Sequence, residues 1–299
     1  MSRDVRVARA REQVVRLCWS ALASLGASSS DRRHDDWFID PEALILLTRT
    51  IHGLDPRLDH ALADWHERHR SLVSDLRLKL GAQRLQTPRT SAIETHWKSR
   101  VPAHELVFAD SASEAAPRRP CQFLLRLRAC LGLGARTELL GHLLLTADSR
   151  PLCSIELSEA TLYSKRNINA ALELLRWSEL LTVKAVGNSP RYSLPLQSRT
   201  DFVNLFGPLP AGPTLGFDEA EFILHWLALL DRTKQHGTGD LDLEAGAFLH
   251  LVQRHRSRLE SDHRLPLAHQ RGQPGFAALH EAVDAFLAGA ANGRFQAQD

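Results

Sequence analysis

The stretch that most constrains the fold is an amphipathic run that predicts a helix from Lys165 to about Trp177. Ser164 directly precedes it and is a residue type that accepts a hydrogen bond from the first turn of a helix. Its apolar residues recur at i, i+3, i+4 and i+7, which places them on one face of the helix. These residues are Ile168, Ala171, Leu172 and Leu175.

The opposite face of this predicted helix is polar. It carries Lys165, Arg166, Asn169 and Glu173. Two cations and an amide crowd the first turns of this face, where a recognition helix contacts phosphates and base edges. We therefore expect these side chains, together with the cap Ser164, to contact nucleic acid.

Two β-prone runs follow, residues 180–186 and 191–194, and the turn-rich sequence Gly187-Asn-Ser-Pro190 separates them. This pattern predicts a β-hairpin. Lys184 and Arg191 would lie on its strands, with Asn188 and Ser189 at its tip. We expect these four residues to reach backbone phosphates or the minor groove.

Shorter elements precede the amphipathic helix. The first of two predicted helices is expected to end at Gly132 and the second before Arg150-Pro151, because glycine and proline interrupt helices. Leu152-Cys153 is short enough to form a single β-bridge, and Ser154 is the expected cap of the next helix. The predicted helices are Phe123–Leu131, Ala135–Thr146 and Ile155–Ala160.

This order of elements carries a family resemblance. The residues from Leu157 to Leu175, including Leu162-Tyr-Ser-Lys-Arg-Asn-Ile-Asn169, resemble bacterial winged helix-turn-helix regulators of the MarR/ArsR type. The stretch from Phe123 to Leu140 also resembles the entry to that domain in a group of bacterial winged-helix proteins. The resemblance covers about a quarter of the chain. It implies sequence-specific binding of double-stranded DNA through helix 164–177, with the hairpin as a supporting wing.

Two positions depart from the family pattern. The turn before the long helix often carries Gly, whereas this chain has Leu162. The end of the helix usually carries Gly, whereas this chain continues Arg176-Trp-Ser-Glu-Leu-Leu181. These departures put the geometry of both turns in question, and we expect Trp177 to pack against another domain.

Residues 1–115 are expected to form a helical N-terminal domain. An amphipathic helix is predicted from Ser2 to Leu25, and Asp40-Pro41 and Asp55-Pro56 each begin a further helix with a capping carboxylate followed by proline. A helix from Leu72 to Leu80 is expected to end at Gly81, a residue typical of helix C-termini.

The expected fold class is mainly α. The winged helix-turn-helix is expected to span residues 121–196, and a C-terminal helical bundle is expected to span residues 214–290. The predicted helices of this bundle are 218–230, 243–259 and 276–287, with Phe217, Phe222 and Trp226 in the core. Asp240, Asp242 and Glu244 are expected to mark the beginning of a helix rather than an ion site.

The charge distribution fits a nucleic-acid module joined to a different one. Residues 121–200 contain ten basic and six acidic residues, whereas residues 201–299 contain eight and thirteen. Arg126, Arg128 and the arginines of the first helix are expected to add contacts to the DNA backbone. Cys18, Cys130 and Cys153 lie in apolar contexts, so we expect reduced core cysteines and a cytoplasmic protein.

Other chemistry finds little support in the sequence. The histidines His60, His66 and His69 share a helix, but a metal site requires further ligands, so no metal and no cofactor are expected. No nucleophile motif or phosphate-binding lysine motif occurs, so no enzyme activity is expected. No apolar run approaches the length of a membrane span.

The function we expect is transcriptional regulation, as a repressor that acts as a homodimer on palindromic double-stranded DNA. The alternative is a protein-interaction module, such as an antitoxin or a subunit of a bacterial defence assembly, whose winged helix binds a partner protein. A protein partner of the C-terminal helical domain is also considered. Exposure of helix 164–177 in the structure would favour DNA binding. Burial of this helix against the acidic C-terminal part of the chain would favour binding of a partner protein.

Overall fold

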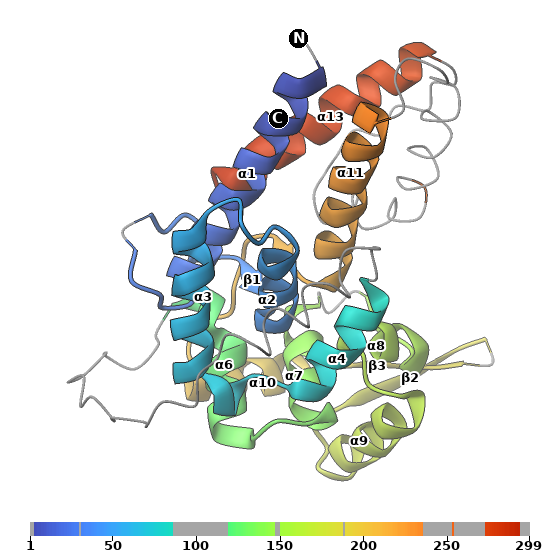
Figure 1. Ribbon diagram of the computed structural model, residues 1–299. Coiled ribbons are helices and arrows are strands. Elements are labelled where there is room, and N and C mark those ends of the chain that lie inside the picture. Colours follow the sequence, from blue (N-terminus) through green and yellow to red (C-terminus); the bar gives the residue numbers. More distant parts are fainter. Residues whose placement is uncertain are drawn as a thin grey trace.

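The computed structural model describes residues 3–29, 31–85, 119–146, 150–187, 189–235, 253 and 273–293. The fold is mainly helical with a small antiparallel hairpin, as the sequence predicts (Figure 1). In chain order the elements are α1 (Arg3–Ser24), β1 (Phe38–Ile39), α2 (Pro41–Thr50), α3 (Pro56–Arg68), η1 (Arg70–Leu72), α4 (Asp75–Arg84), η2 (Pro120–Gln122), α6 (Phe123–Leu131), α7 (Ala135–Leu145), α8 (Ser154–Thr161), α9 (Lys165–Trp177), β2 (Thr182–Val186), β3 (Ser189–Ser193), α10 (Leu196–Phe206), β4 (Thr214–Leu215), α11 (Phe217–Gln235) and α13 (Gln273–Ala291).

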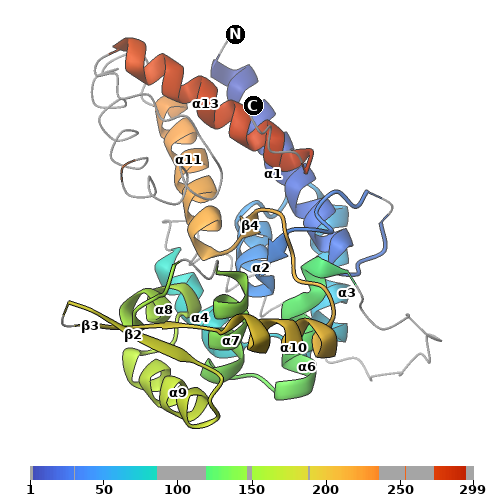
Figure 2. The same ribbon diagram turned by 180° about the vertical axis from the view of Figure 1, so that it is seen from behind.

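Buried apolar side chains form two separate cores. One core belongs to α6–α10 and the hairpin, residues 123–206, which we call the central unit. The other belongs to the described parts of residues 3–85, to 214–235 and to 273–293, which we call the body, and Cys121 and Leu125 also pack in it. Figure 2 shows the central unit below the body, with α1, α11 and α13 at the far end of the molecule.

The body is assembled from segments that lie on both sides of the central unit in the sequence. Helix α1 packs against both α11 and α13. Strand β1 pairs in parallel with β4, so Phe38 lies opposite Thr214. Arg11 on α1 also binds both carboxylate oxygens of Asp231 on α11, at 2.7 and 2.9 Å. The expected N-terminal and C-terminal domains therefore share one core.

Several local predictions are confirmed by the contacts of individual residues. The Asp40 carboxylate accepts hydrogen bonds from the backbone amides of Glu42 and Ala43, both at 3.1 Å, at the beginning of α2. Asp55 caps α3 in the same way through the amide of Arg57 at 3.0 Å. The aromatic residues expected in the C-terminal core are buried, and they are Phe217, Phe222 and Trp226.

Other local predictions are wrong. Helix α4 does not end at Gly81 but continues through it to Arg84. Glycine is needed there for packing, because a Cβ atom at this position would lie 2.2 Å from Cε1 of Phe217 and 2.8 Å from Cδ1 of Leu46. Helix α10 lies between the expected winged helix-turn-helix and the expected C-terminal bundle, where no helix was predicted. Apart from Gln253, the predicted helix 243–259 lies outside the described residues, and so does its acidic cluster.

The cysteines also differ from expectation. Cys18 and Cys121 are buried, but Cys130 is exposed and Cys153 is only half-buried. Cys130 is the penultimate residue of α6, and the apolar sequence around it belongs to the exposed connection to α7. Burial raises the pKa of the Cys18 thiol to about 12, which keeps that residue protonated.

The close packing at Gly81 generates a prediction. Changing Gly81→Ala should lower the free energy of unfolding by about 1–3 kcal/mol, because the added methyl group would overlap the Phe217 ring. Urea denaturation measures this loss. The matched control is Gly141→Ala in α7, where the nearest atom is Cδ1 of Leu124 at 3.2 Å, an overlap far smaller than that at Gly81. Equal effects of the two substitutions would contradict the packing argument.

Candidate nucleic-acid interface

Helix α9 is fixed to the central unit by one face. The side chains of Ile168, Ala171, Leu172 and Leu175 are buried, as their spacing predicts. The Ser164 side chain caps the helix by accepting a hydrogen bond from the backbone amide of Asn167 at 3.3 Å. The apolar spacing thus determines which face of α9 is turned away from the protein.

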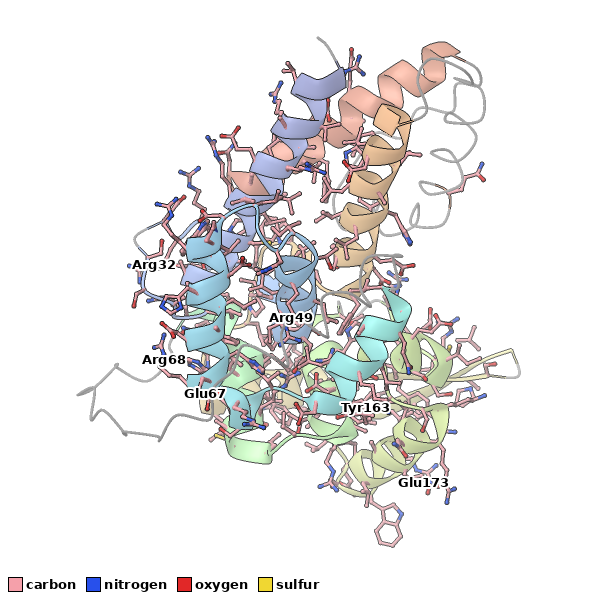
Figure 3. All side chains as sticks on the ribbon, viewed as in Figure 1. Arg32, Arg49, Glu67, Arg68, Tyr163 and Glu173 are labelled. Atoms are coloured by element: carbon pink, nitrogen blue, oxygen red, sulfur yellow. The ribbon has the colours of Figure 1, made fainter. Side chains whose placement is uncertain are left out.

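The outward face of α9 carries the residues singled out in the sequence. The side chains of Lys165, Arg166, Asn169 and Glu173 are all exposed. Figure 3 shows Glu173 on the outer side of α9, away from the rest of the molecule. These groups therefore lie together on an open surface at the edge of the central unit.

The hairpin follows α9 as predicted, with Lys184 opposite Arg191 in its register. Leu152 adds the expected single β-bridge, because its backbone exchanges two hydrogen bonds with Tyr192, at 3.0 and 2.8 Å. The side chains of Lys184 and Ser189 are exposed. Asn188, expected at the tip, lies outside the described residues.

Arg191 differs from the other predicted contacts because protein groups hold its side chain. Its guanidinium donates to the Glu156 carboxylate and to the backbone carbonyl of Pro151, both at 3.1 Å. Glu156 also accepts from the backbone amide of Cys153 at 2.8 Å, so Cys153, and not Ser154 as expected, is the cap of α8. Arg191 thus joins the wing strand to the beginning of α8.

The two departures from the family's glycine pattern lie at unusual backbone conformations. Within the described residues, Leu162 and Glu179 are the non-glycine residues with positive φ, at 62° and 56°. Leu162 ends α8, and its side chain packs against the body core. After α9, the amides of Glu179 and Leu180 donate to the carbonyls of Arg176 and Leu175, a left-handed ending that usually contains Gly.

Arg126 and Arg128 do not add exposed cations to this surface, contrary to expectation. Arg126 donates to the carbonyls of Phe206 at 2.6 Å and Arg119 at 2.7 Å. Arg128 is 1% exposed and lies between the central unit and the body. The sequence placed both arginines beside a predicted nucleic-acid helix but gave no indication of their partners.

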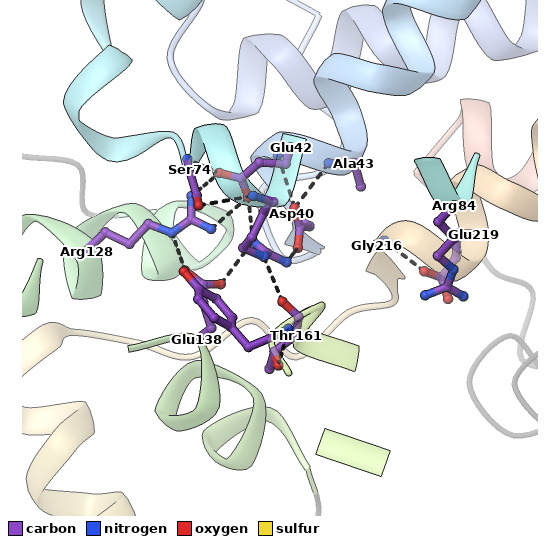
Figure 4. A network of polar contacts seen from close by, with 12 residues as sticks. Asp40, Glu42, Ala43, Ser74, Arg84, Arg128, Glu138, Thr161, Gly216 and Glu219 are labelled. Carbon is purple, nitrogen blue, oxygen red and sulfur yellow. Dashed lines mark hydrogen bonds and ion pairs between the residues drawn. The ribbon is translucent and has the colours of Figure 1, made fainter. Parts of the chain in front are cut away.

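Arg128 belongs to a buried ion-pair network (Figure 4). Its guanidinium binds Glu42 of α2, at 2.7 and 2.8 Å, and Glu138 of α7 at 2.7 Å. Arg77 of α4 binds the same two carboxylates and also Asp40. Three carboxylates therefore share two guanidinium groups, away from solvent.

The network also determines how the turn before α9 is attached. Nε of Arg77 donates to the carbonyl oxygen of Thr161 at 3.1 Å, and Nη1 of Arg128 donates to that of Leu72 at 2.7 Å. Figure 4 shows Arg128, Glu138 and Thr161 of the central unit beside Asp40 and Glu42 of the body. The turn between α8 and α9 is thus fixed to the body.

The two acidic residues at the beginning of α2 respond differently to the network. Burial alone would raise the pKa of Glu42, but the charges of Arg128 and Arg77 outweigh burial and hold that pKa at about 2. Burial raises the pKa of Asp40 to about 6, since Arg77 compensates it only in part and Glu42 repels it. Asp40 is therefore the least compensated charge of the network.

A separate cleft of about 960 Å³ opens between the central unit and the body. Its walls carry charged residues of both parts, and Arg84 is paired there with Asp218 and with Glu221, the latter at 3.0 Å. Neither α9 nor the hairpin strands contribute to its lining. The cleft is thus distinct from the exposed face of α9.

His69, at the C-terminal end of α3, makes a local contact instead of taking part in a metal site. Nδ1 of His69 lies 2.8 Å from the carbonyl oxygen of Trp65, and its ring stacks on the indole with centroids 4.6 Å apart. Among the described residues, no group of three or more His, Cys, Asp or Glu side chains is arranged to hold a metal ion.

The positive φ of Glu179 generates a prediction. Changing Glu179→Gly should raise the free energy of unfolding by about 1 kcal/mol, because glycine adopts the left-handed conformation without the clash of a Cβ atom. Thermal unfolding followed by circular dichroism measures the gain. Ser178→Gly is the control and should destabilise instead, since φ of Ser178 is −84°. A loss of stability in Glu179→Gly would show that this turn is unstrained.

The buried network generates a second prediction. Changing Arg128→Met should cost about 3–5 kcal/mol of unfolding free energy, because it leaves two buried carboxylates without one of their cations. The control Arg191→Met breaks an ion pair that is about one-third exposed, and it should cost less than about 1 kcal/mol. Chemical denaturation of both variants tests this difference, and a small loss for Arg128→Met would contradict the structural role of the network.

The whole chain was compared with known proteins. No protein-family model, no curated protein and no solved structure matches the chain. Within the residues that the structure describes, no helix combines the length and the apolar character needed to cross a membrane.

Proposed function

We propose that residues 121–196 form a winged helix-turn-helix that binds double-stranded DNA and that the protein regulates transcription in the cytoplasm, as a repressor. The observation that carries this proposal is the outward face of α9. Its cations and amide, Lys165, Arg166 and Asn169, are exposed on a helix whose other face is packed in the core. Such a helix is able to enter a major groove about 12 Å wide without unfolding any part of the protein.

The residues on this face suit different parts of a duplex. Arg166 is the residue type that binds guanine through O6 and N7, and Asn169 the type that binds adenine through N6 and N7. Lys184 and Ser189 are exposed on the hairpin, where they would contact phosphates. Arg191 would act indirectly, since its ion pair with Glu156 fixes the position of the hairpin.

The position of α9 also weighs against the main alternative, a module that binds only protein through this helix. Burial of α9 against the acidic C-terminal part of the chain would have favoured that alternative. The outward face of α9 is instead exposed, and α9 packs against α7 and α8. In the proposed complex, a homodimer would place two copies of α9 about one helical turn of DNA apart, so the bound sequence would be palindromic.

Selection of bound sequences from a random duplex library tests the proposed function. Wild-type protein should enrich one palindromic sequence. Arg166→Ala and Asn169→Ala should each cost about 1–3 kcal/mol and relax the preference at one base position. Lys184→Ala should instead weaken binding to all duplexes and lower the slope of affinity against salt by about one.

The control is Arg16→Ala, which removes an exposed cation from α1 in the body. Helix α1 lies at the opposite end of the molecule from α9 (Figure 1), so in the proposed complex its arginines do not contact the DNA, unlike the expectation from the sequence. Arg16→Ala should leave both affinity and sequence preference unchanged. Absence of any enriched sequence, or an equal effect of Arg16→Ala and Arg166→Ala, would overturn the proposal.

A further inference from the structure

Trp177, the last residue of α9, is the most exposed of the large apolar side chains that the structure describes. It is 84% exposed, whereas Trp37, Trp65 and Trp226 are buried. It does not pack against another domain, which corrects the expectation from the sequence. An indole in water leaves a large apolar surface unburied and a donor N–H available to a ligand.

Trp177 lies on the same side of α9 as the residues proposed to read bases. Each residue turns an α-helix by about 100°, so Trp177, eleven residues after Arg166, is rotated from it by only about 20°. Glu173 is rotated by about 20° in the other direction. Leu174, which is 50% exposed, is rotated by about 80° and lies at the side of this face.

The spacing along the helix separates the roles of these side chains. Glu173 lies about 10 Å beyond Arg166 along the axis, within the width of a major groove of about 12 Å. Trp177 lies about 17 Å beyond Arg166, which exceeds that width. A helix that presents Arg166 to base edges and crosses the groove therefore brings Trp177 to the sugar–phosphate strand at the far side.

We propose that Trp177 binds the sugar–phosphate backbone of the duplex at the edge of the major groove and so limits how far α9 enters it. The indole ring would cover deoxyribose, and its Nε1–H would donate to a phosphate oxygen. This inference rests on the proposed function, because it requires that α9 enters a groove. Trp177 would make an apolar contact that does not depend on the DNA sequence, in addition to the base contacts made at the other end of the helix.

Fluorescence of Trp177 tests the inference directly. The emission of wild-type protein minus that of Trp177→Phe isolates this residue from the other tryptophans. The probe is a duplex of about 30 base pairs recovered from the library selection, which is long enough for two half-sites. Acrylamide should quench the isolated emission efficiently in free protein and several-fold less efficiently when the duplex is bound.

Affinity measurements with matched variants complete the experiment. Trp177→Ala should weaken binding about tenfold without changing the preferred sequence, because it removes a hydrogen bond to a charged group together with the ring contact. Trp177→Phe should lose less affinity than Trp177→Ala, since phenylalanine retains an aromatic ring. Leu174→Ala is the control, an exposed apolar residue at the side of the face, and it should bind as wild type does.

The outcomes separate this inference from the proposed function. If Arg166→Ala weakens binding but Trp177 stays fully quenchable and Trp177→Ala binds normally, the inference is wrong and the proposed function stands. If none of these variants affects binding, both are wrong. If Trp177→Ala dissociates a dimer of the DNA-free protein in sedimentation, Trp177 serves contact between protein chains and the inference is overturned.

Discussion

Two guanidinium groups and three carboxylates, all withdrawn from water, hold the central unit on the body. Arg128 reaches from α6 to Glu42 on α2, and Arg77 reaches from α4 to Glu138 on α7. Burial of such charges is unfavourable unless they are paired. Removal of either guanidinium group would therefore leave buried carboxylates without a cation. The contact between the two parts therefore includes this network together with apolar packing, since Leu125 and Leu162 also lie against the body core.

This constraint gives the exposed surface of α9 its orientation. The network holds the carbonyl of Thr161, three residues before Ser164 caps α9, and the side chain of Leu162 packs into the body core. The backbone at Leu162 has a left-handed conformation that glycine adopts more readily than leucine. The contact of the Leu162 side chain with the body core opposes this cost, since glycine would relieve the backbone but lose the contact.

The parts that sequence alone could predict are those that depend on local patterns. The spacing of Ile168, Ala171 and Leu172 determined both the helix and its exposed face, and the β-prone runs predicted the hairpin. The network could not be found in this way, because Arg128 and Glu42 are 86 residues apart and nothing local distinguishes a buried arginine from an exposed one. Helix α10 could have been found from the spacing of Phe202 and Phe206, whose rings stack.

The division of the body across the chain has a consequence for biosynthesis. The central unit is a continuous segment with its own core, so it is able to fold as soon as it leaves the ribosome. The body core contains side chains of α1, α11 and α13, and it stays open until the last of these helices has been translated. During that interval α2 and α3 are available to cover part of the apolar face of α1, but the part that packs against α11 and α13 stays uncovered. Transiently exposed apolar surface of this kind is what chaperones bind.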